Sequence, residues 1–282
     1  MKIIECPRDA MQGIETFIPT QTKARYINQL LKVGFDTIDF GSFVSPKAIP
    51  QLRDTAEVLR LLDLSGTRSK LLAIVANTRG AVEAAAFSEI HYLGFPLSIS
   101  ETFQQRNTNK SIAEALNVVA EIQDVCAQKG KELVTYISMG FGNPYGDPYD
   151  VGVVGQFVDI LQTLGVPIVS LADTIGVSQP AQIRFLFESL TKQFPKIEFG
   201  AHLHSHPATA TEKIEAAYQA GCQRFDGAIK GFGGCPMAED ELVGNLPTEL
   251  VLAYLTQQGS APAMNEAEWL KALVLADSVF PK

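Results

Sequence analysis

The chain of 282 residues carries a formal net charge of −8, with 46% hydrophobic and 19% charged residues. This balance supports a sizeable buried core and disfavours intrinsic disorder. It also argues against nucleic acid as the main partner, because binding to phosphates along a strand needs a basic surface, although a phosphorylated small ligand needs only a local basic patch. The four cysteines (Cys6, Cys126, Cys222 and Cys235) form no C-x-x-C pair. We therefore expect neither a disulfide framework nor a structural zinc site.

No apolar run approaches the roughly 20 residues of a membrane span. The segment Met1–Glu5 alternates at once between polar and apolar residues and leaves no room for a signal peptide. These observations predict a soluble, cytoplasmic protein with no membrane partner.

Eight short runs of β-branched and apolar residues recur along the chain and predict eight strands. They are continuously apolar, which is typical of parallel strands covered on both faces. The predicted strands are Lys2–Cys6, Thr37–Phe40, Lys70–Ala76, Glu89–Gly94, Glu132–Ser138, Val166–Ala172, Lys196–His202 and Arg224–Ala228.

Helical patterns lie between most of these runs. The segment from Ser111 to Glu114 is typical of a capping box, and the helix that follows is predicted to end at Gly130. Helix–glycine–strand junctions at Gly34, Gly165 and Gly221 indicate a repeated β/α unit. The connection between the third and fourth strands is short, so its helix is the weakest prediction.

This alternation predicts a (β/α)8 TIM barrel, which needs roughly 250 residues, with additional C-terminal helices from Glu239 onward. We expect a single domain over residues 1–282. The structural alternative is an open doubly wound sheet, which often has a glycine-rich phosphate loop after its first strand. Here the first predicted strand runs into Cys6-Pro7-Arg8-Asp9 instead, and this favours the barrel.

Polar side chains follow most of the predicted strands, where the active site of a barrel lies. These side chains come from distant parts of the sequence: Arg8 and Asp9, Asp39 and Ser42, Asn77, Asp173 and Thr174, His202 and His204, and the glycine-rich segment Gly231–Cys235.

The His202-Leu-His204 pair is the sharpest local signal. Residues i and i+2 at a strand end share a face, so both imidazoles can approach one cation, and Asp9 can add an oxygen ligand. An isolated H-x-H more often reflects one capping and one solvated histidine. His206 is left open as a further ligand, a supporting group or an exposed side chain.

Other polar residues have ordinary structural explanations beside functional ones. Asp173 could be no more than a helix N-cap, and Cys235 could be a small buried residue. His91 is expected to pack inside the barrel within the fourth strand rather than to bind a metal.

Several motifs in order resemble the 3-hydroxy-3-methylglutaryl-CoA lyase family of the DRE-TIM metallolyase superfamily, over nearly the whole chain. The most distinctive are Ser42–Lys47 (SFVSPK) and Gly231–Pro236 (GFGGCP). The others are Pro7-Arg8-Asp9 with Gln12, Pro50-Gln51, Ser100-Glu101 with Phe103, Pro144-Tyr145, Ser170–Gly176 (SLADTIG), the His202/His204 pair and Gly244-Asn245-Leu246.

The resemblance implies that a divalent cation, magnesium or manganese, is bound by Asp9, His202, His204 and Asn245. It implies that Arg8 neutralises a thioester enolate and that Cys235 lies on a mobile loop over the site and acts in catalysis. Lys47, Arg106 and Lys110 are candidates for contacts to the phosphates of CoA.

Further substrate contacts are expected from a set of polar residues at the strand ends: Gln12, Ser42, Lys47, Asn77, Ser170, Asp173 and Thr174. The general base is left open among Asp9, Asp39 and His202. We expect a homodimer whose substrate partner is a CoA thioester.

Three features depart from the family pattern. Asp39 stands where the family has a glutamate, and Ser205 follows His204 where the family has an aspartate. The loop after the fourth strand, Gly94–Ser100, is expected to be a few residues longer than usual.

The reaction that the resemblance implies is cleavage of 3-hydroxy-3-methylglutaryl-CoA to acetoacetate and acetyl-CoA, which belongs to leucine degradation and ketone-body formation. One alternative is a sister enzyme of the superfamily, either an acyl-CoA and 2-oxoacid condensing enzyme or a pyruvate-forming aldolase. Another is a barrel that binds metal or acyl-CoA without catalysis.

Overall fold

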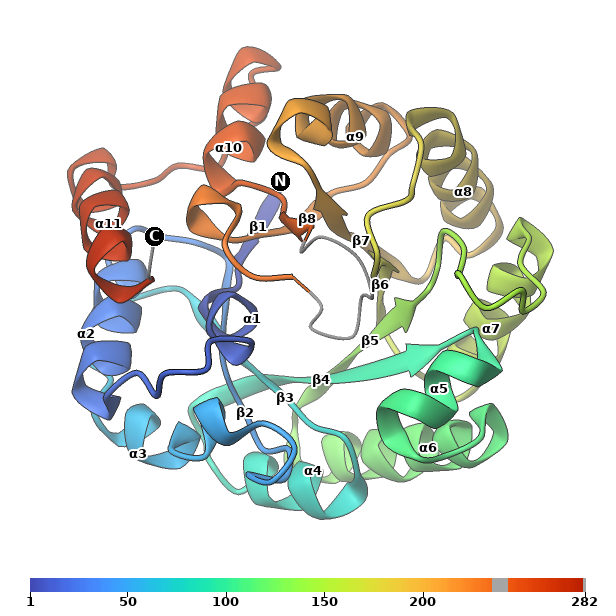
Figure 1. Ribbon diagram of the computed structural model, residues 1–282, viewed down its shortest axis with the longest axis horizontal. Helices are drawn as coiled ribbons and strands as arrows, with labels where there is room; N and C mark the ends of the chain where they lie inside the picture. The colour runs from blue at the N-terminus through green and yellow to red at the C-terminus, as the bar shows by residue number, and fades with distance from the viewer. Residues whose placement is uncertain (235–242, 281–282) are drawn as a thin grey trace.

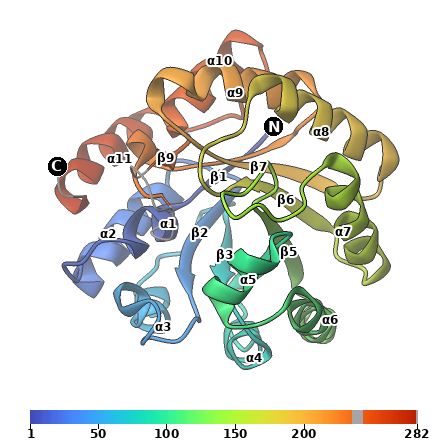
Figure 2. The same cartoon turned by 45° about the vertical axis from the view of Figure 1, so that its right-hand side comes forward.

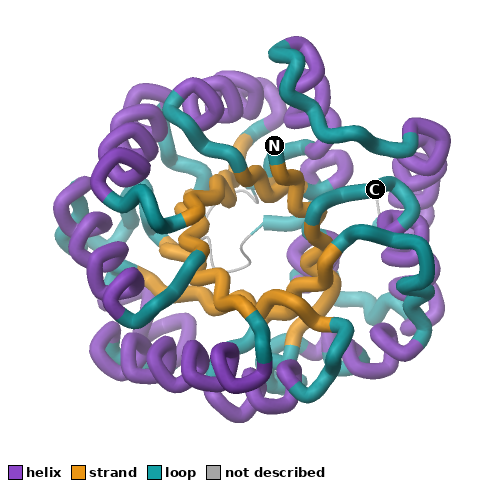
Figure 3. Tube along the Cα trace, turned by 180° about the vertical axis from the view of Figure 1, so that it is seen from behind, coloured by secondary structure: helices purple, strands orange, loops and turns teal. Residues whose placement is uncertain are grey.

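Eight parallel strands close into a barrel in a computed structural model that describes residues 1–234 and 243–280. Each strand pairs with its neighbours in the sequence, and β1 pairs with β8 to close the ring. Seen along the barrel axis, the strands form an inner ring and the helices an outer one (Figures 1 and 3). The predicted TIM barrel is therefore confirmed.

All eight predicted strands are present, and the fifth has the predicted bounds. The strands are β1 (Lys2–Glu5), β2 (Thr37–Ser42), β3 (Lys70–Ile74), β4 (Ile90–Ser98), β5 (Glu132–Ser138), β6 (Ile168–Asp173), β7 (Glu198–Ser205) and β8 (Arg224–Gly227). A short strand, β9 (Gly244–Asn245), pairs antiparallel with the end of β7.

Two predictions about β4 are wrong. Residues 94–98 are strand rather than loop, because Gly94 does not end β4 but leaves room for Ile74, whose Cδ1 would lie 2.5 Å from a Cβ at that position. His91 is exposed rather than packed in the barrel. Side chains alternate along a strand, so His91 points away from the buried Ile90 and Tyr92.

The helices follow the strands around the barrel. They are α1 (Pro7–Gln12), α2 (Thr20–Leu31), α3 (Thr55–Arg60), α4 (Thr78–Ala85), α5 (Glu101–Thr108), α6 (Ile112–Lys129), α7 (Val151–Thr163), α8 (Pro180–Gln193), α9 (Pro207–Gln219), α10 (Thr248–Gln257) and α11 (Glu266–Val279), with 3-10 turns at Pro50–Leu52 and Ile229–Gly231.

The sequence signals for helix ends are confirmed. Ser111 and Glu114 form the capping box at the start of α6, and Gly130 ends that helix in a left-handed conformation. The junction glycines Gly34, Gly165 and Gly221 also have positive φ, which lets the chain turn from helix to strand without a Cβ clash.

The two C-terminal helices complete the outer ring. Helix α11 lies beside α2 (Figures 1 and 2), where Trp269 packs edge-on against Phe35 with ring centroids 6.0 Å apart. Gln29 of α2 also donates a hydrogen bond to the Glu268 side chain of α11. Among the described residues, no helix has the length and apolar character needed to cross a membrane.

Glu5, a buried residue of β1, forms hydrogen bonds with two segments that follow β8. The carboxylate of Glu5 accepts hydrogen bonds from the backbone N–H of Ile229 (2.9 Å) and from the hydroxyl of Thr248 (2.6 Å). Burial raises the pKa of Glu5 from 4.5 to about 8, although these two donors oppose the shift. At neutral pH the side chain is therefore mostly protonated in the folded protein.

We predict that Glu5→Gln makes the stability of the protein less sensitive to a rise in pH from about 4.5 to 8. Between about pH 4.5 and 8 the folded state binds more protons at Glu5 than the unfolded chain does, so the free energy of unfolding falls as pH rises through this window. The glutamine variant lacks this titration. Relative to wild type it should gain up to about 1.4 kcal/mol per pH unit across the window.

Urea unfolding of both proteins at several pH values measures this difference. A difference that stays constant from about pH 5 to about pH 8 would show that Glu5 is ionised in the folded barrel.

Candidate metal centre and active site

Three ligand-type side chains converge at the carboxyl ends of the strands. Asp9 comes from α1, directly after β1, and His202 and His204 come from the end of β7, where residues two apart share a face. All three are buried, and one ligand atom from each lies within 4.8 Å of the other two. The predicted His-x-His pair therefore does meet the predicted oxygen ligand.

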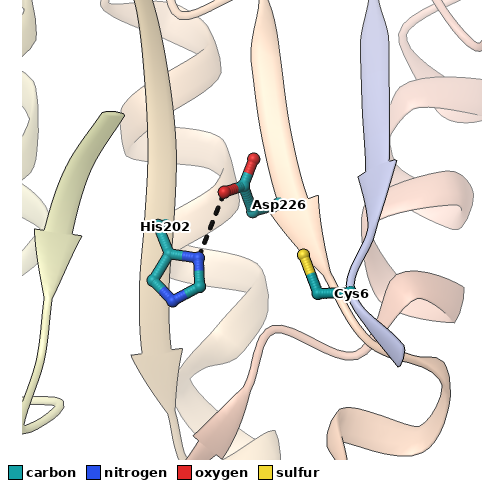
Figure 4. Close-up of side chains that lie close together, drawn as sticks. All are labelled: Cys6, His202 and Asp226. Carbon is teal, nitrogen blue, oxygen red and sulfur yellow. Dashed lines mark hydrogen bonds and ion pairs between the residues drawn. The ribbon is translucent and has the colours of Figure 1, made fainter. Parts of the chain in front are cut away.

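The two histidines are oriented by different partners. Nδ1 of His204 lies 3.0 Å from the backbone oxygen of Thr174, and Nδ1 of His202 lies 3.1 Å from Oδ2 of Asp226 (Figure 4). Because each contact engages Nδ1, each ring has Nε2 available for the site. Nε2 of His204 is buried 4.0 Å from Oδ2 of Asp9 and forms no hydrogen bond with any described residue.

Asn245 joins this group through the short strand β9. The antiparallel pairing sets Asn245 opposite His204, and its Nδ2 donates hydrogen bonds to Oδ2 of Asp9 (2.8 Å) and to the backbone oxygen of Phe232 (2.9 Å). All four predicted ligands thus lie together. The amide nitrogen faces Asp9, so cation binding through the amide oxygen needs a rotation of this group.

Arg8 lies between two buried carboxylates. Its Nε and Nη2 bind Asp39, with an Nη2–Oδ2 distance of 2.6 Å, and its Nη1 donates to Oδ1 of Asp9 (2.8 Å) and to Gln12 (2.9 Å). Burial alone would lower the pKa of Arg8, but the charges of Asp39 and Asp9 keep it above its ordinary value. The guanidinium therefore stays charged.

The same charges set the protonation of the neighbouring groups. Burial alone would raise the pKa of Asp9, but the charges of Arg8, His202 and His204 hold it below its ordinary value. Burial lowers the pKa of His204, and the charge of His202 lowers it further. An ionised carboxylate beside a neutral imidazole with a free Nε2 is a donor set that fits a divalent cation such as Mn²⁺ or Mg²⁺.

The site opens into a cavity of about 420 Å³. Its polar end is formed by Arg8, Asp9, Gln12, His202 and His204. The remaining wall is mostly apolar, apart from the polar residues at the end of α5 and a few others. It consists of Val44, Ala48, Ile49, Ile74, Ala76, Pro96, Phe103, Arg106, Asn107, Thr108, Tyr136, Ser138, Ala172 and Thr174. A ligand that combines one charged end with an extended apolar body would fit this division.

Two of the predicted substrate contacts, Gln12 and Thr174, line the cavity. Thr174 also accepts a hydrogen bond from the backbone N–H of Met139 through its hydroxyl, which fixes the loop after β6. Arg106 lines the cavity as well and lies over the ring of Tyr145, 4.7 Å from its centroid. Lys47 and Lys110 are not among the lining residues.

Three other predicted contacts, Asn77, Ser42 and Ser170, are not among the residues that line the cavity. Asn77 caps α4 by accepting a hydrogen bond from Gly80, and the hydroxyl of Ser42 accepts one from Val44. Ser170 is fully buried within β6. A contact of these side chains with a ligand therefore stays a prediction.

Asp173 caps no helix. Its carboxylate accepts hydrogen bonds from Nζ of Lys213 (2.8 Å) and from the backbone of Ser178 (3.0 Å). Lys213 also donates to the backbone oxygens of Gly176 and His204, both at 2.9 Å. This buried pair joins the ends of β6 and β7, and the hydrogen bond from Lys213 to the backbone oxygen of His204 helps to fix that residue.

The remaining candidates lie apart. His206 is exposed and caps α9 through its side chain, so it does not join the centre. Cys235 lies outside the described residues. Cys6, Cys126 and Cys222 are buried.

Sequence reasoning missed Asp226, the partner of His202. A signal was available, because Arg224 and Asp226 are charged residues two apart in an otherwise apolar predicted strand and therefore share one face. A charged pair on the inward face of a barrel strand indicates a partner inside the barrel.

Glycines hold the segment after β8 against the centre. A Cβ at Gly233 would lie 2.9 Å from the backbone oxygen of Asp9 and 2.8 Å from Nδ2 of Asn245. The position also has a φ of +92°, which a residue with a side chain rarely adopts. The close approach of Gly233 therefore helps to place both Asp9 and Asn245.

We predict that Gly233→Ala weakens Mn²⁺ binding roughly 10- to 100-fold, because a displacement of ligands by about 1 Å has effects of this size. Gly66→Ala is the matched control, since Gly66 has a φ of +82° but no atom within 4 Å of its Cβ position. Both variants place a side chain at a positive φ and should lose stability, Gly233→Ala more because its Cβ also meets backbone atoms, while only Gly233→Ala loses metal affinity. Titration with Mn²⁺ followed by EPR measures the affinity, and equal affinities for the two variants would contradict this account of Gly233.

The fold and the site together define a TIM barrel with a buried carboxylate–imidazole centre at the carboxyl ends of its strands. A family model described as HMGL-like matches residues 2–275, and the chain belongs to this HMGL-like family. The resemblance found in the sequence is thus confirmed.

Individual relatives agree with this assignment. The chain is 35% identical over 254 residues to a hydroxymethylglutaryl-CoA lyase of Bacillus subtilis, a match that covers 89% of this chain and 83% of the relative. It is 34% identical to a 3-hydroxy-3-isohexenylglutaryl-CoA/hydroxymethylglutaryl-CoA lyase of Pseudomonas aeruginosa, covering 88% and 82%.

Among solved structures, an HMG-CoA lyase from Acinetobacter baumannii in complex with coenzyme A and 3-methylmalate superposes with a TM-score of 0.90. It is 29% identical in sequence, and the match covers 99% of this chain and 90% of that one.

Proposed function

We propose that this protein is a 3-hydroxy-3-methylglutaryl-CoA lyase, which splits its substrate into acetoacetate and acetyl-CoA. The observation that carries the proposal is the convergence of Arg8, Asp9, His202 and His204 at one end of the cavity in a chain of the HMGL-like family. The names of the relatives support a substrate of the 3-hydroxy-3-alkylglutaryl-CoA type.

The chemical problem is the carbanion that remains when the C–C bond breaks. A thioester delocalises this charge as an enolate, and a fixed cationic donor stabilises the enolate oxygen. Arg8 has five N–H donors, and its contacts with Asp39, Asp9 and Gln12 use four of them. One N–H on Nη2 is left without a partner among the described residues, and we assign it to the thioester oxygen.

A divalent cation would be held by Asp9, His202 and His204, with Asn245 after rotation of its amide. Once bound, it would lower the pKa of the substrate's tertiary hydroxyl and favour its ionisation. The residues themselves fix where the hydroxyl and the distal carboxylate lie, because α1 and β7 hold the ligands rigidly.

Asp39 fits the role of a positioning residue for Arg8 rather than that of the base. Its side chain is fully buried, it does not line the cavity, and both of its oxygens face the guanidinium. Although Asp39 is one methylene shorter than the family's glutamate, it still reaches Arg8. The proton of the tertiary hydroxyl then goes to Asp9, which lines the cavity, because His202 has no free nitrogen once Nδ1 donates to Asp226 and Nε2 faces the cation.

The second half of the reaction needs a proton donor for the enolate. We propose that Cys235 supplies this proton, on the strength of the GFGGCP motif. Its thiol group can donate a proton near neutral pH once a closed site excludes water.

The direct test is release of acetoacetate and acetyl-CoA from 3-hydroxy-3-methylglutaryl-CoA by purified protein loaded with Mg²⁺ or Mn²⁺. We expect metal-dependent cleavage, which His204→Ala should abolish while circular dichroism shows an intact barrel. Condensation of acetyl-CoA with a 2-oxoacid in place of cleavage would assign the chain to a sister activity, and binding without turnover would overturn the proposal.

We predict that Arg8→Lys lowers kcat far more than it raises KM. Lysine offers a mobile point charge. The planar guanidinium is fixed by its hydrogen bonds to Asp39, Asp9 and Gln12, and this fixes the direction of its free N–H. If the N–H acts mainly on charge that develops in the transition state, the loss appears in kcat, by roughly 100-fold or more. A variant with an unchanged kcat and a raised KM would instead assign Arg8 to ground-state binding.

We predict that a neutral alkylating reagent modifies Cys235 alone in the native protein and inactivates it. The other three thiols are buried, and burial raises the pKa of Cys126 and Cys222 to about 12 and that of Cys6 well above its ordinary value. Mass spectrometry after iodoacetamide treatment should find one labelled site, absent from Cys235→Ser. Turnover of Cys235→Ser at the wild-type rate would remove the thiol from the mechanism.

A further inference from the structure

One of the two histidines of the centre depends on a side chain for its orientation. His204 is oriented by the backbone oxygen of Thr174, whereas His202 is oriented by the carboxylate of Asp226 on the neighbouring strand β8 (Figure 4). An imidazole ring with no partner on one nitrogen can rotate or change its tautomer. The contact with Asp226 therefore decides which nitrogen His202 presents to the cavity.

The charge of Asp226 is buried, so groups inside the protein must compensate it. Its side chain is fully buried, and Oδ1 has no hydrogen-bond partner among the described residues. Arg224, two residues earlier on the same face of β8, is also fully buried, and the charge of Asp226 helps to keep the pKa of Arg224 above its ordinary value. Gly200 makes room for this arginine, because a Cβ there would lie 3.1 Å from Cδ of Arg224.

The thiol of Cys6 lies in the same group but cannot replace the carboxylate. Cys6, His202 and Asp226 place one ligand-type atom each within 4.8 Å of one another. The thiol donates to the backbone oxygen of Ile4 (3.6 Å), whereas Oδ2 of Asp226 lies 3.1 Å from Nδ1 of His202. Asp226 is therefore the acceptor for His202.

From this geometry we propose that Asp226 is a positioning residue of the metal centre, which accepts a hydrogen bond from Nδ1 of His202 and so directs Nε2 of His202 to the cation. The inference rests on the proposed metal-dependent function. Arg224 acts on Asp226 only through its charge, because its ion pair is with Glu198 (3.5 Å) rather than with Asp226.

The test compares two substitutions that differ in one property. Asp226→Asn keeps an oxygen that can accept from Nδ1, whereas Asp226→Leu has a similar volume and no acceptor. With Mn²⁺ affinity measured by EPR on the purified protein, we expect Asp226→Leu to weaken binding roughly 10- to 100-fold and Asp226→Asn to retain most of it. Thr135→Val, which replaces another buried polar group that has no hydrogen-bond partner, should leave the affinity unchanged.

Repeating the Asp226 substitution in a His202→Ala variant distinguishes a positioning role of Asp226 from general damage to the fold. In His202→Ala the partner of Asp226 is absent, so adding Asp226→Leu should weaken Mn²⁺ binding no further. An undiminished additional loss in that background would overturn the proposal, as would wild-type affinity in Asp226→Leu alone. The Mn²⁺ affinities do not depend on turnover, so they test the role of Asp226 by themselves. Absence of acetoacetate release by the wild type would overturn the proposed function instead.

Discussion

The site depends on the buried carboxylate of Asp9. It accepts three hydrogen bonds from side chains, and an ionised carboxylate accepts these more strongly than a protonated one would. Asp9 accepts hydrogen bonds from Arg8 and Gln12 on one oxygen and from Asn245 on the other, and both histidines face it. Burying an ion away from water is unfavourable unless charged or polar partners compensate it. The barrel meets this requirement with partners from α1, β7 and β9, and these segments are held together in the process.

Arg8 links this carboxylate to the rest of the barrel. Its guanidinium is shared between Asp9 and Asp39, which follow β1 and lie on β2 respectively. Two buried carboxylates surround one guanidinium, so the charge of Arg8 leaves one carboxylate charge to be balanced by the histidines or by a bound cation. Among the described residues, the same arrangement leaves one N–H of Arg8 without a partner, so Arg8 can stabilise a developing charge in one direction only.

The barrel and the position of its site could be predicted from the sequence, because parallel strands covered on both faces produce continuous apolar runs and because polar residues cluster after them. The errors have physical causes. Gly94 looks like a strand end, yet it lies in the middle of β4 because Ile74 fills the space of its absent side chain. His91 lies within an apolar run, yet strand alternation turns it outward.

The partners of individual side chains were beyond the sequence, because they depend on which strands become neighbours. Asp173 looks equally suited to capping, to ligand binding and to an ion pair, and only the packing of α9 against β7 brings Lys213 to it. The spacing of Arg224 and Asp226 marks an inward-facing charge, but its partner His202 is set by the pairing of β8 with β7. Tertiary neighbours, rather than local patterns, decided these roles.

Anomalous diffraction at the manganese edge, from crystals of the protein soaked in Mn²⁺, would show where the cation binds. We expect one strong anomalous peak within bonding distance of Asp9, His202 and His204, with Nδ1 of His202 still on Asp226. A peak elsewhere, or none at saturating Mn²⁺, would contradict the assignment of this buried cluster as the metal centre.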